Sequence, residues 1–141
     1  MVSYNFLFDI HMFCSIWMTA VILIVQFIHY PQFLVVESSA WVKTAIHHQK
    51  VMGVLVGPIM IVELFSWLIL FNYLYETYLN LWVGVALIMI CLWVSTFFIQ
   101  VPYHKQLLNN KSEWVINKLI KTNLIRTALW SLKLLILIIF F

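Results

Sequence analysis

The chain has 141 residues, of which 65% are hydrophobic and only 9% are charged. A soluble domain has about 45–50% apolar and about 25% charged residues, so the composition excludes a soluble domain, and it excludes a disordered chain as well. The net charge of +3 gives no reason to expect a nucleic-acid partner, because basic residues in a membrane protein report orientation first. We expect one transmembrane domain over residues 1–141, with the lipid bilayer as its surroundings.

Four apolar runs are long enough to cross a membrane, since a spanning helix needs about 20 residues. They cover residues 6–30, 48–71, 79–101 and 122–141. Pro31 and Pro102 directly follow the first and third runs, where proline ordinarily ends a helix. The sequence therefore predicts an all-α fold, an integral membrane four-helix bundle with up-down topology.

The connections between the runs differ in length. Residues 32–47 and 103–121 form long connections, whereas residues 72–78 form a tight one. Within the last connection, residues 112–121 alternate apolar and charged side chains, with Trp114 beside Glu113. Such a pattern is typical of an amphipathic helix in the membrane interface, and we expect one there.

The basic residues predict the orientation. Seven of them belong to one side of the bundle: Lys43, Lys50, Lys105, Lys111, Lys118, Lys121 and Arg126. By the positive-inside rule that side is cytoplasmic, and both termini face the periplasm. The expected location is the inner (plasma) membrane, crossed several times.

Each predicted helix carries one polar stripe, and such stripes turn away from lipid in a bundle. Glu63 is the clearest member, because it is the only charge in the apolar run 51–71. A carboxylate at that depth costs about 2.5–3.5 kcal/mol on insertion scales and is kept where it pairs or works.

Depth along the helices, at about 1.5 Å per residue, sorts the polar residues into two layers. The cytoplasmic layer contains Gln26, Gln100, Asn123 and Arg126, with histidines at the helix ends: His29, His48 and His104. The second layer contains His11, Glu63 and Lys133. We predict an ion pair between Glu63 and Lys133.

Several of these residues also have a purely structural interpretation. The Glu63–Lys133 pair can serve only to fix helix register, and Arg126 can extend to lipid phosphates. His29 and His104 can be interfacial residues with solvated tips, and Lys50 can be a topology charge alone. His47 is expected to face the headgroups.

The histidines admit metal chemistry. His29, His48 and His104 come from three helices at one level and form a candidate three-histidine site for copper, iron or zinc. A haem needs an axial ligand, an apolar slot and cations for its propionates. His11 is the candidate haem ligand, and Lys133, Arg126 or Lys50 are the candidate cations.

The layout resembles the HemJ-type protoporphyrinogen IX oxidases. The resemblance rests on His11 followed by Trp17, on Tyr30-Pro31-Gln32-Phe33 at the helix exit, on Lys50 ahead of Pro58 and Met60, and on Asn123 near the start of the last helix. It implies haem b, with His11 as the ligand and Lys50 as a functional cation. Residues 57–63, 100–104 and 123–133 look more like small uncharacterised four-helix bacterial membrane proteins.

The leading hypothesis is a membrane oxidoreductase or electron carrier that binds haem or a related cofactor in the bundle interior. Its candidate catalytic residues are Glu63, Lys50, Arg126 and Lys133, and its candidate cofactor-binding residues are His11, Gln26, Gln100 and Asn123. A membrane redox partner or a second copy of the chain is the expected protein partner. The alternatives are a non-catalytic structural or assembly subunit, and a small proton-coupled transporter.

Overall fold

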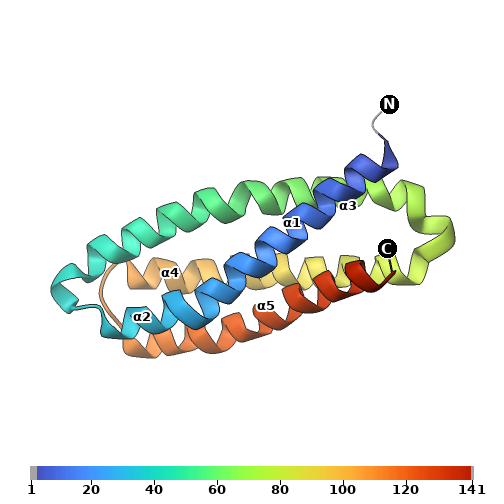
Figure 1. Cartoon of the computed structure of the whole chain (residues 1–141). Coiled ribbons are helices and arrows are strands. Elements are labelled where there is room, and N and C mark those ends of the chain that lie inside the picture. Colours follow the sequence, from blue (N-terminus) through green and yellow to red (C-terminus); the bar gives the residue numbers. More distant parts are fainter. Residues whose placement is uncertain (1–2, 141) are drawn as a thin grey trace.

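The computed structural model describes residues 3–140, apart from the side chain of Tyr75. Four helical spans run back and forth along one elongated bundle (Figure 1). Each is long and apolar enough to cross a membrane: Tyr4–Val35, Ser38–Leu74, Glu76–Leu107 and Glu113–Phe140. The predicted all-α class and the four long helices are therefore confirmed, and these are the first to fourth spans below.

The first span contains α1 (Tyr4–Ile24), a π-helical turn η1 (Val25–His29) and α2 (Tyr30–Val35). Ser3 caps α1 by accepting a hydrogen bond from the Phe6 N–H. The helix was predicted to end at Pro31, but it continues to Val35. The π turn explains this difference, because the Tyr30 N–H bonds to the Val25 carbonyl and proline then falls at the start of α2, where its missing N–H is tolerated.

The second span and the first part of the third belong to α3 (Ser38–Ser95), which reverses direction at Tyr78, where φ is −129° and ψ is 32°. The second span begins well before the predicted residue 48, so most of the expected connection 32–47 is helical. Trp41 accounts for this start, because its indole is buried and its Nε1 donates to the Leu107 carbonyl at 2.7 Å.

The third span ends as the first does, with a π turn followed by a short α-helix that has proline near its start. A π-helical turn, η2 (Thr96–Gln100), precedes α4 (Val101–Leu107), and Pro102 is the second residue of α4. The Val101 N–H bonds to the Thr96 carbonyl, as the Tyr30 N–H does to Val25 in the first span. Each π turn places a buried glutamine, Gln26 or Gln100, in the bundle.

The fourth span is the single helix α5 (Glu113–Phe140). The separate interfacial helix expected over residues 112–121 is therefore wrong, since residues 113–121 are the first turns of α5. The amphipathic pattern has another cause: Ile116 and Leu119 are buried against the bundle while Trp114 is exposed.

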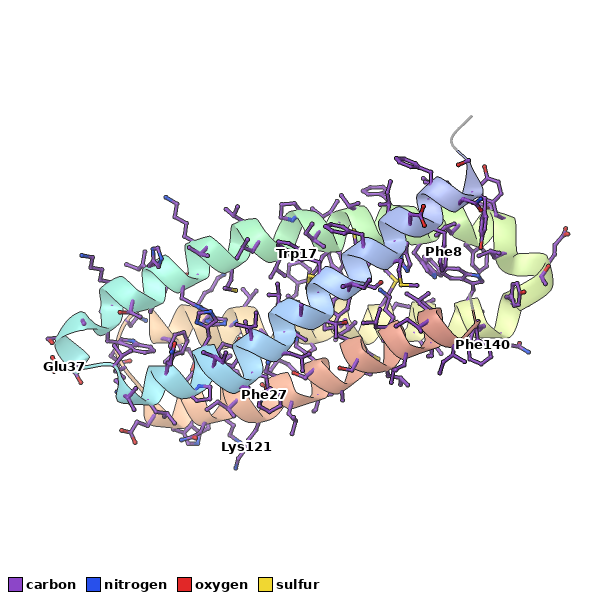
Figure 2. All side chains as sticks on the ribbon, viewed as in Figure 1. Phe8, Trp17, Phe27, Glu37, Lys121 and Phe140 are labelled. Carbon is purple, nitrogen blue, oxygen red and sulfur yellow. The ribbon has the colours of Figure 1, made fainter. Side chains whose placement is uncertain are left out.

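The two ends of the bundle differ. The N- and C-termini lie at the same end as the reversal between the second and third spans (Figure 1). At the opposite end, Lys111 links the connection between the third and fourth spans to the end of the first span. Its ammonium group donates to the carbonyls of Leu34 at 2.8 Å and Val36 at 2.7 Å. Glu37 and Lys121 also lie toward this end (Figure 2).

The outer surface of the bundle is apolar along the spans. Phe27 and Phe98 are 65% and 77% exposed. A soluble protein rarely exposes such extensive apolar surface, so this surface fits a lipid bilayer. The polar residues described next are on the inside.

Candidate functional site

The second polar layer, which lies nearer to the termini, is built around an ion pair. Lys133 of α5 bonds to the Glu63 carboxylate of α3, and both side chains are fully buried. The predicted Glu63–Lys133 pair is therefore confirmed. Ser15 of α1 completes it, because its hydroxyl lies 2.8 Å from Glu63 Oε1 and 2.9 Å from Lys133 Nζ. The Lys133 Nζ also lies 4.9 Å from the centre of the Trp130 ring.

His11 borders the same layer. Its Nδ1 lies 3.0 Å from the Ser66 hydroxyl, and Ser66 donates to the Glu63 backbone carbonyl at 2.9 Å. The ring is fully buried and lies 6.0 Å from the Trp82 ring, centre to centre. Among the described residues, His11 Nε2 has no hydrogen-bond partner. The imidazole is therefore oriented by a serine, with its second nitrogen facing packed protein.

The cytoplasmic layer of the prediction contains a second, separate network. Asn123 of α5 donates to Gln26 Oε1 at 2.9 Å and accepts from Arg126 at 3.0 Å. Gln26 in turn donates to the Ile120 carbonyl at 3.3 Å. The structure thus brings together three of the predicted residues from the first and fourth spans.

Gln100 and His104 meet Tyr30 in the same region. The Tyr30 hydroxyl donates to Gln100 Oε1 at 3.3 Å and lies 3.0 Å from His104 Nε2. Gln100 donates to the Thr122 hydroxyl at 3.0 Å. Tyr30 is only 2% exposed, and its two partners lie on the third span.

The three predicted histidines are neighbours. The His48 ring lies 5.6 Å from the His29 ring and 5.4 Å from the His104 ring, centre to centre. His11 is in the other layer and does not join them. Within residues 3–140, no three His, Cys, Asp or Glu side chains form a group arranged to hold a metal ion. The metal assignments stay predictions.

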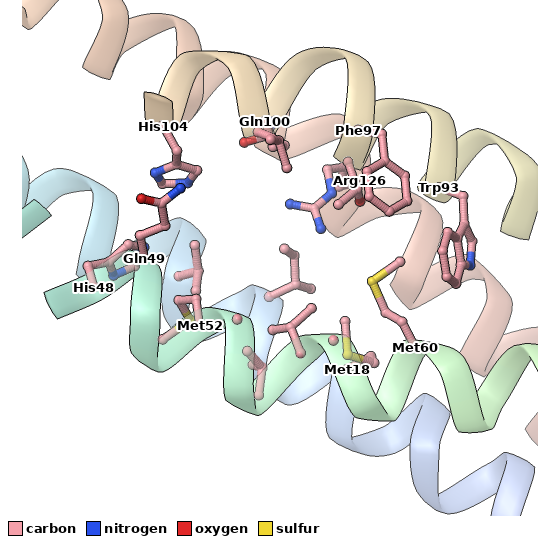
Figure 3. Close-up of a pocket in the computed structure, with 18 of the residues that line it drawn as sticks. Met18, His48, Gln49, Met52, Met60, Trp93, Phe97, Gln100, His104 and Arg126 are labelled. Atoms are coloured by element: carbon pink, nitrogen blue, oxygen red, sulfur yellow. The ribbon is translucent and has the colours of Figure 1, made fainter. Parts of the chain in front are cut away.

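A cavity of about 390 Å³ opens between the second and third spans. Its wall is mostly apolar and includes Met18, Met52, Met60, Trp93 and Phe97, and its polar residues are Tyr30, His48, Gln49, Thr96, Gln100, His104 and Arg126. Figure 3 shows the Arg126 guanidinium projecting into this space, with His48 and His104 toward one end and Trp93 toward the other. We call it the arginine cavity.

Arg126 has no negative partner among the residues that the structure describes. It is only 5% exposed, and Asn123 Oδ1 is the one side-chain acceptor that it meets in the described part of the chain. Its Nε has no partner there, and the Glu63–Lys133 bridge is at the other layer. Such burial differs from an arginine that extends to lipid phosphates.

A smaller cavity of about 210 Å³ lies farther along the same two spans. Its lining is almost wholly apolar: Leu64, Trp67, Ala86, Met89, Ile90, Trp93 and Val94. Trp93 borders both cavities. We call this one the apolar cavity.

Some site residues were placed differently from the prediction, and others were missed. Lys50, a predicted site residue, is exposed and borders neither cavity. His47 was not a predicted site residue, and it is exposed, as expected for a residue that faces the headgroups. Ser66 and Tyr30 were missed as site residues. A signal existed for each: Ser66 is one helical turn after Glu63, and Tyr30 is directly before Pro31.

No protein-family model, curated protein or solved structure matches the chain.

Proposed function

We propose that the protein binds a hydrophobic acid from the membrane in the arginine cavity, with Arg126 as its counter-ion. The observation that carries the proposal is a buried guanidinium that has no carboxylate partner among the described residues and faces a cavity. An arginine inside a membrane costs about 2.5–3.5 kcal/mol on insertion scales. A bound carboxylate or phosphate supplies the missing charge and forms strong charge-assisted hydrogen bonds.

The composition of the cavity wall supports a ligand with one polar end. Small-molecule sites are typically cavities of about 300–1,000 Å³ with mostly apolar walls and a few convergent polar groups. The arginine cavity, at about 390 Å³, has this character. Gln100 and His104 add hydrogen-bonding groups beside Arg126, whereas the methionines and Phe97 form an adaptable apolar wall.

Two glycines keep the cavity wide. Gly53 and Gly57 both line it, and a Cβ added at either would meet nothing within 4 Å. A larger side chain at Gly57 can therefore occupy the cavity without displacing the backbone. Gly84 has equally open surroundings and lines neither cavity, so it provides a matched control.

The test is equilibrium binding of radiolabelled palmitate to the purified protein in detergent. We expect saturable binding that weakens by about tenfold or more in Arg126→Met, because losing one member of a buried charge pair costs at least about 2 kcal/mol. Gly57→Leu should weaken binding, and Gly84→Leu should not. Equal affinity in wild type and Arg126→Met, with both proteins folded, would refute the proposal.

Haem binding, the hypothesis favoured by the sequence, is a second candidate at this cavity. His48 and His104 line it, and no described residue hydrogen-bonds to either ring nitrogen of His48. An imidazole nitrogen without a hydrogen-bond partner can serve as an iron ligand, and Arg126 can pair with a haem propionate. When bound, haem would supply one-electron transfer. A Soret band in protein purified with ample haem supply tests this candidate.

A further inference from the structure

Two cavities follow one another along the seam between the second and third spans, and we call this line of two cavities the path. Trp93 stands between them and lines both. Arg126, Gln100 and His104 belong to one part of this path. The other part, from Trp93 to Ala86, has almost no polar surface. The path therefore has a charged end and an apolar end, as an amphipathic chain molecule does.

The length of the path fits a lipid chain. On the third span, Trp93 is about 10 Å and Ala86 about 21 Å from Gln100, at about 1.5 Å per residue. One leaflet of a bilayer, half of a hydrocarbon core of about 30 Å, corresponds to an acyl chain of about 15 Å. A chain whose acid group lies at Arg126 therefore passes Trp93 and ends beside the apolar cavity.

We infer that the ligand is a single-chain lipid acid whose head binds Arg126 and whose tail passes Trp93 into the apolar cavity. This inference rests on the proposed function and names its substrate class. The alignment of the two cavities on either side of Trp93 favours a chain over a compact ligand, because a compact ligand leaves the apolar cavity unused. A carboxylate and a phosphate monoester share the chemistry that Arg126 recognises.

The first experiment varies chain length and fills the apolar cavity. Ala86→Phe should weaken binding of palmitate by about tenfold, equivalent to losing the burial of about two methylene groups. Binding of octanoate, which is too short to pass Trp93 into the apolar cavity, should stay within about twofold of wild type by the same reasoning. Ala20→Phe on the exposed face of α1 is the control and should change neither affinity.

A second experiment avoids substitutions. Palmitate analogues carrying a photoactivatable diazirine near the carboxylate or near the methyl end are cross-linked to the wild-type protein, and the sites are mapped by mass spectrometry. The head-proximal probe should label residues near Phe97 and Gln100. The tail probe should label Met89 or Ile90. Tail labelling confined to the arginine cavity would overturn the inference.

The two proposals fail in different ways. If Arg126→Met abolishes palmitate binding but neither Ala86→Phe nor the tail probe reports on the apolar cavity, the acid site stands and the chain path is wrong. If Arg126→Met binds palmitate normally, the proposed function itself is wrong. Palmitoyl lysophosphatidate, compared with palmitate at equal chain length, identifies the preferred head group.

Discussion

Lys133 reaches Glu63 across the bundle, and the Ser15 hydroxyl contacts both charged groups. Three spans therefore meet at one ion pair deep in the apolar interior. The arrangement satisfies the ammonium and the carboxylate together, so removing either partner leaves the other buried without its charge partner.

We expect Glu63→Gln to lower the free energy of unfolding by about 3 kcal/mol, the lower end of what breaking a buried ion pair costs. Glu63→Gln combined with Lys133→Met should cost less than Glu63→Gln alone, because the double variant holds no unpaired charge. The free energies of unfolding of wild type, the two single variants and the double variant are measured by reversible unfolding in mixed detergent. Strictly additive effects would show that the pair contributes no coupling energy.

Asn123 positions Arg126, since its Oδ1 accepts from the guanidinium and its Nδ2 donates to Gln26. Asn123→Leu should therefore weaken palmitate binding several-fold, even though Asn123 does not itself line the arginine cavity. The cost in stability should be about 1–3 kcal/mol, as for other buried polar groups left unpaired. Thermal unfolding and palmitate titration of one preparation separate the two effects. Unchanged affinity would remove Asn123 from the site.

The haem candidate has two placements, at His11 and at His48. His11 has an oriented ring whose Nε2 has no hydrogen-bond partner among residues 3–140, but it borders neither described cavity. His48, in contrast, lines the arginine cavity. If the purified protein has a Soret band, we expect His48→Ala to abolish or shift it. His47→Ala, at an exposed neighbour, is the control. Loss of the band in His11→Ala alone would restore the placement implied by the sequence resemblance.

The basic residues at one end of the bundle predict its orientation in the membrane. Reporter fusions inserted at the reversal near Tyr78 should read out as periplasmic by the positive-inside rule. Fusions at Asn109 or Asn110, in the connection at the opposite end, should read out as cytoplasmic. The reverse pair of results would invert the bundle and place Arg126 toward the other side.

Hydropathy was enough to predict the four spans, because a membrane span is defined by length and apolarity alone. Depth along each helix was enough to pair Glu63 with Lys133. The cavities could not be predicted in this way, because the empty volume between two helices depends on how the side chains of several helices pack against one another. The helix ends at Val35 and Leu107 were missed for a related reason: a proline is a stop in an α-helix, but a π turn before it lets the helix continue.

The two π turns occupy corresponding positions in the two halves of the chain. Residues 27–31 and 98–102 both read Phe-Ile, two variable residues, then proline, and each stretch straddles the end of a π turn. The match is too short to stand out in the sequence, but in the folded chain each stretch belongs to an odd-numbered span and is followed by an even-numbered one. The bundle can therefore be described as two successive helical hairpins.

Glu63 and Lys133 occupy nearly the same place in the two hairpins, counted from Pro31 and Pro102. Two identical hairpins would bring two carboxylates or two ammonium groups together there, and like charges in contact repel. The pair thus favours association of the two unlike halves over association of either half with its own copy. A dimer of one hairpin with its own copy would lack this attraction between opposite charges.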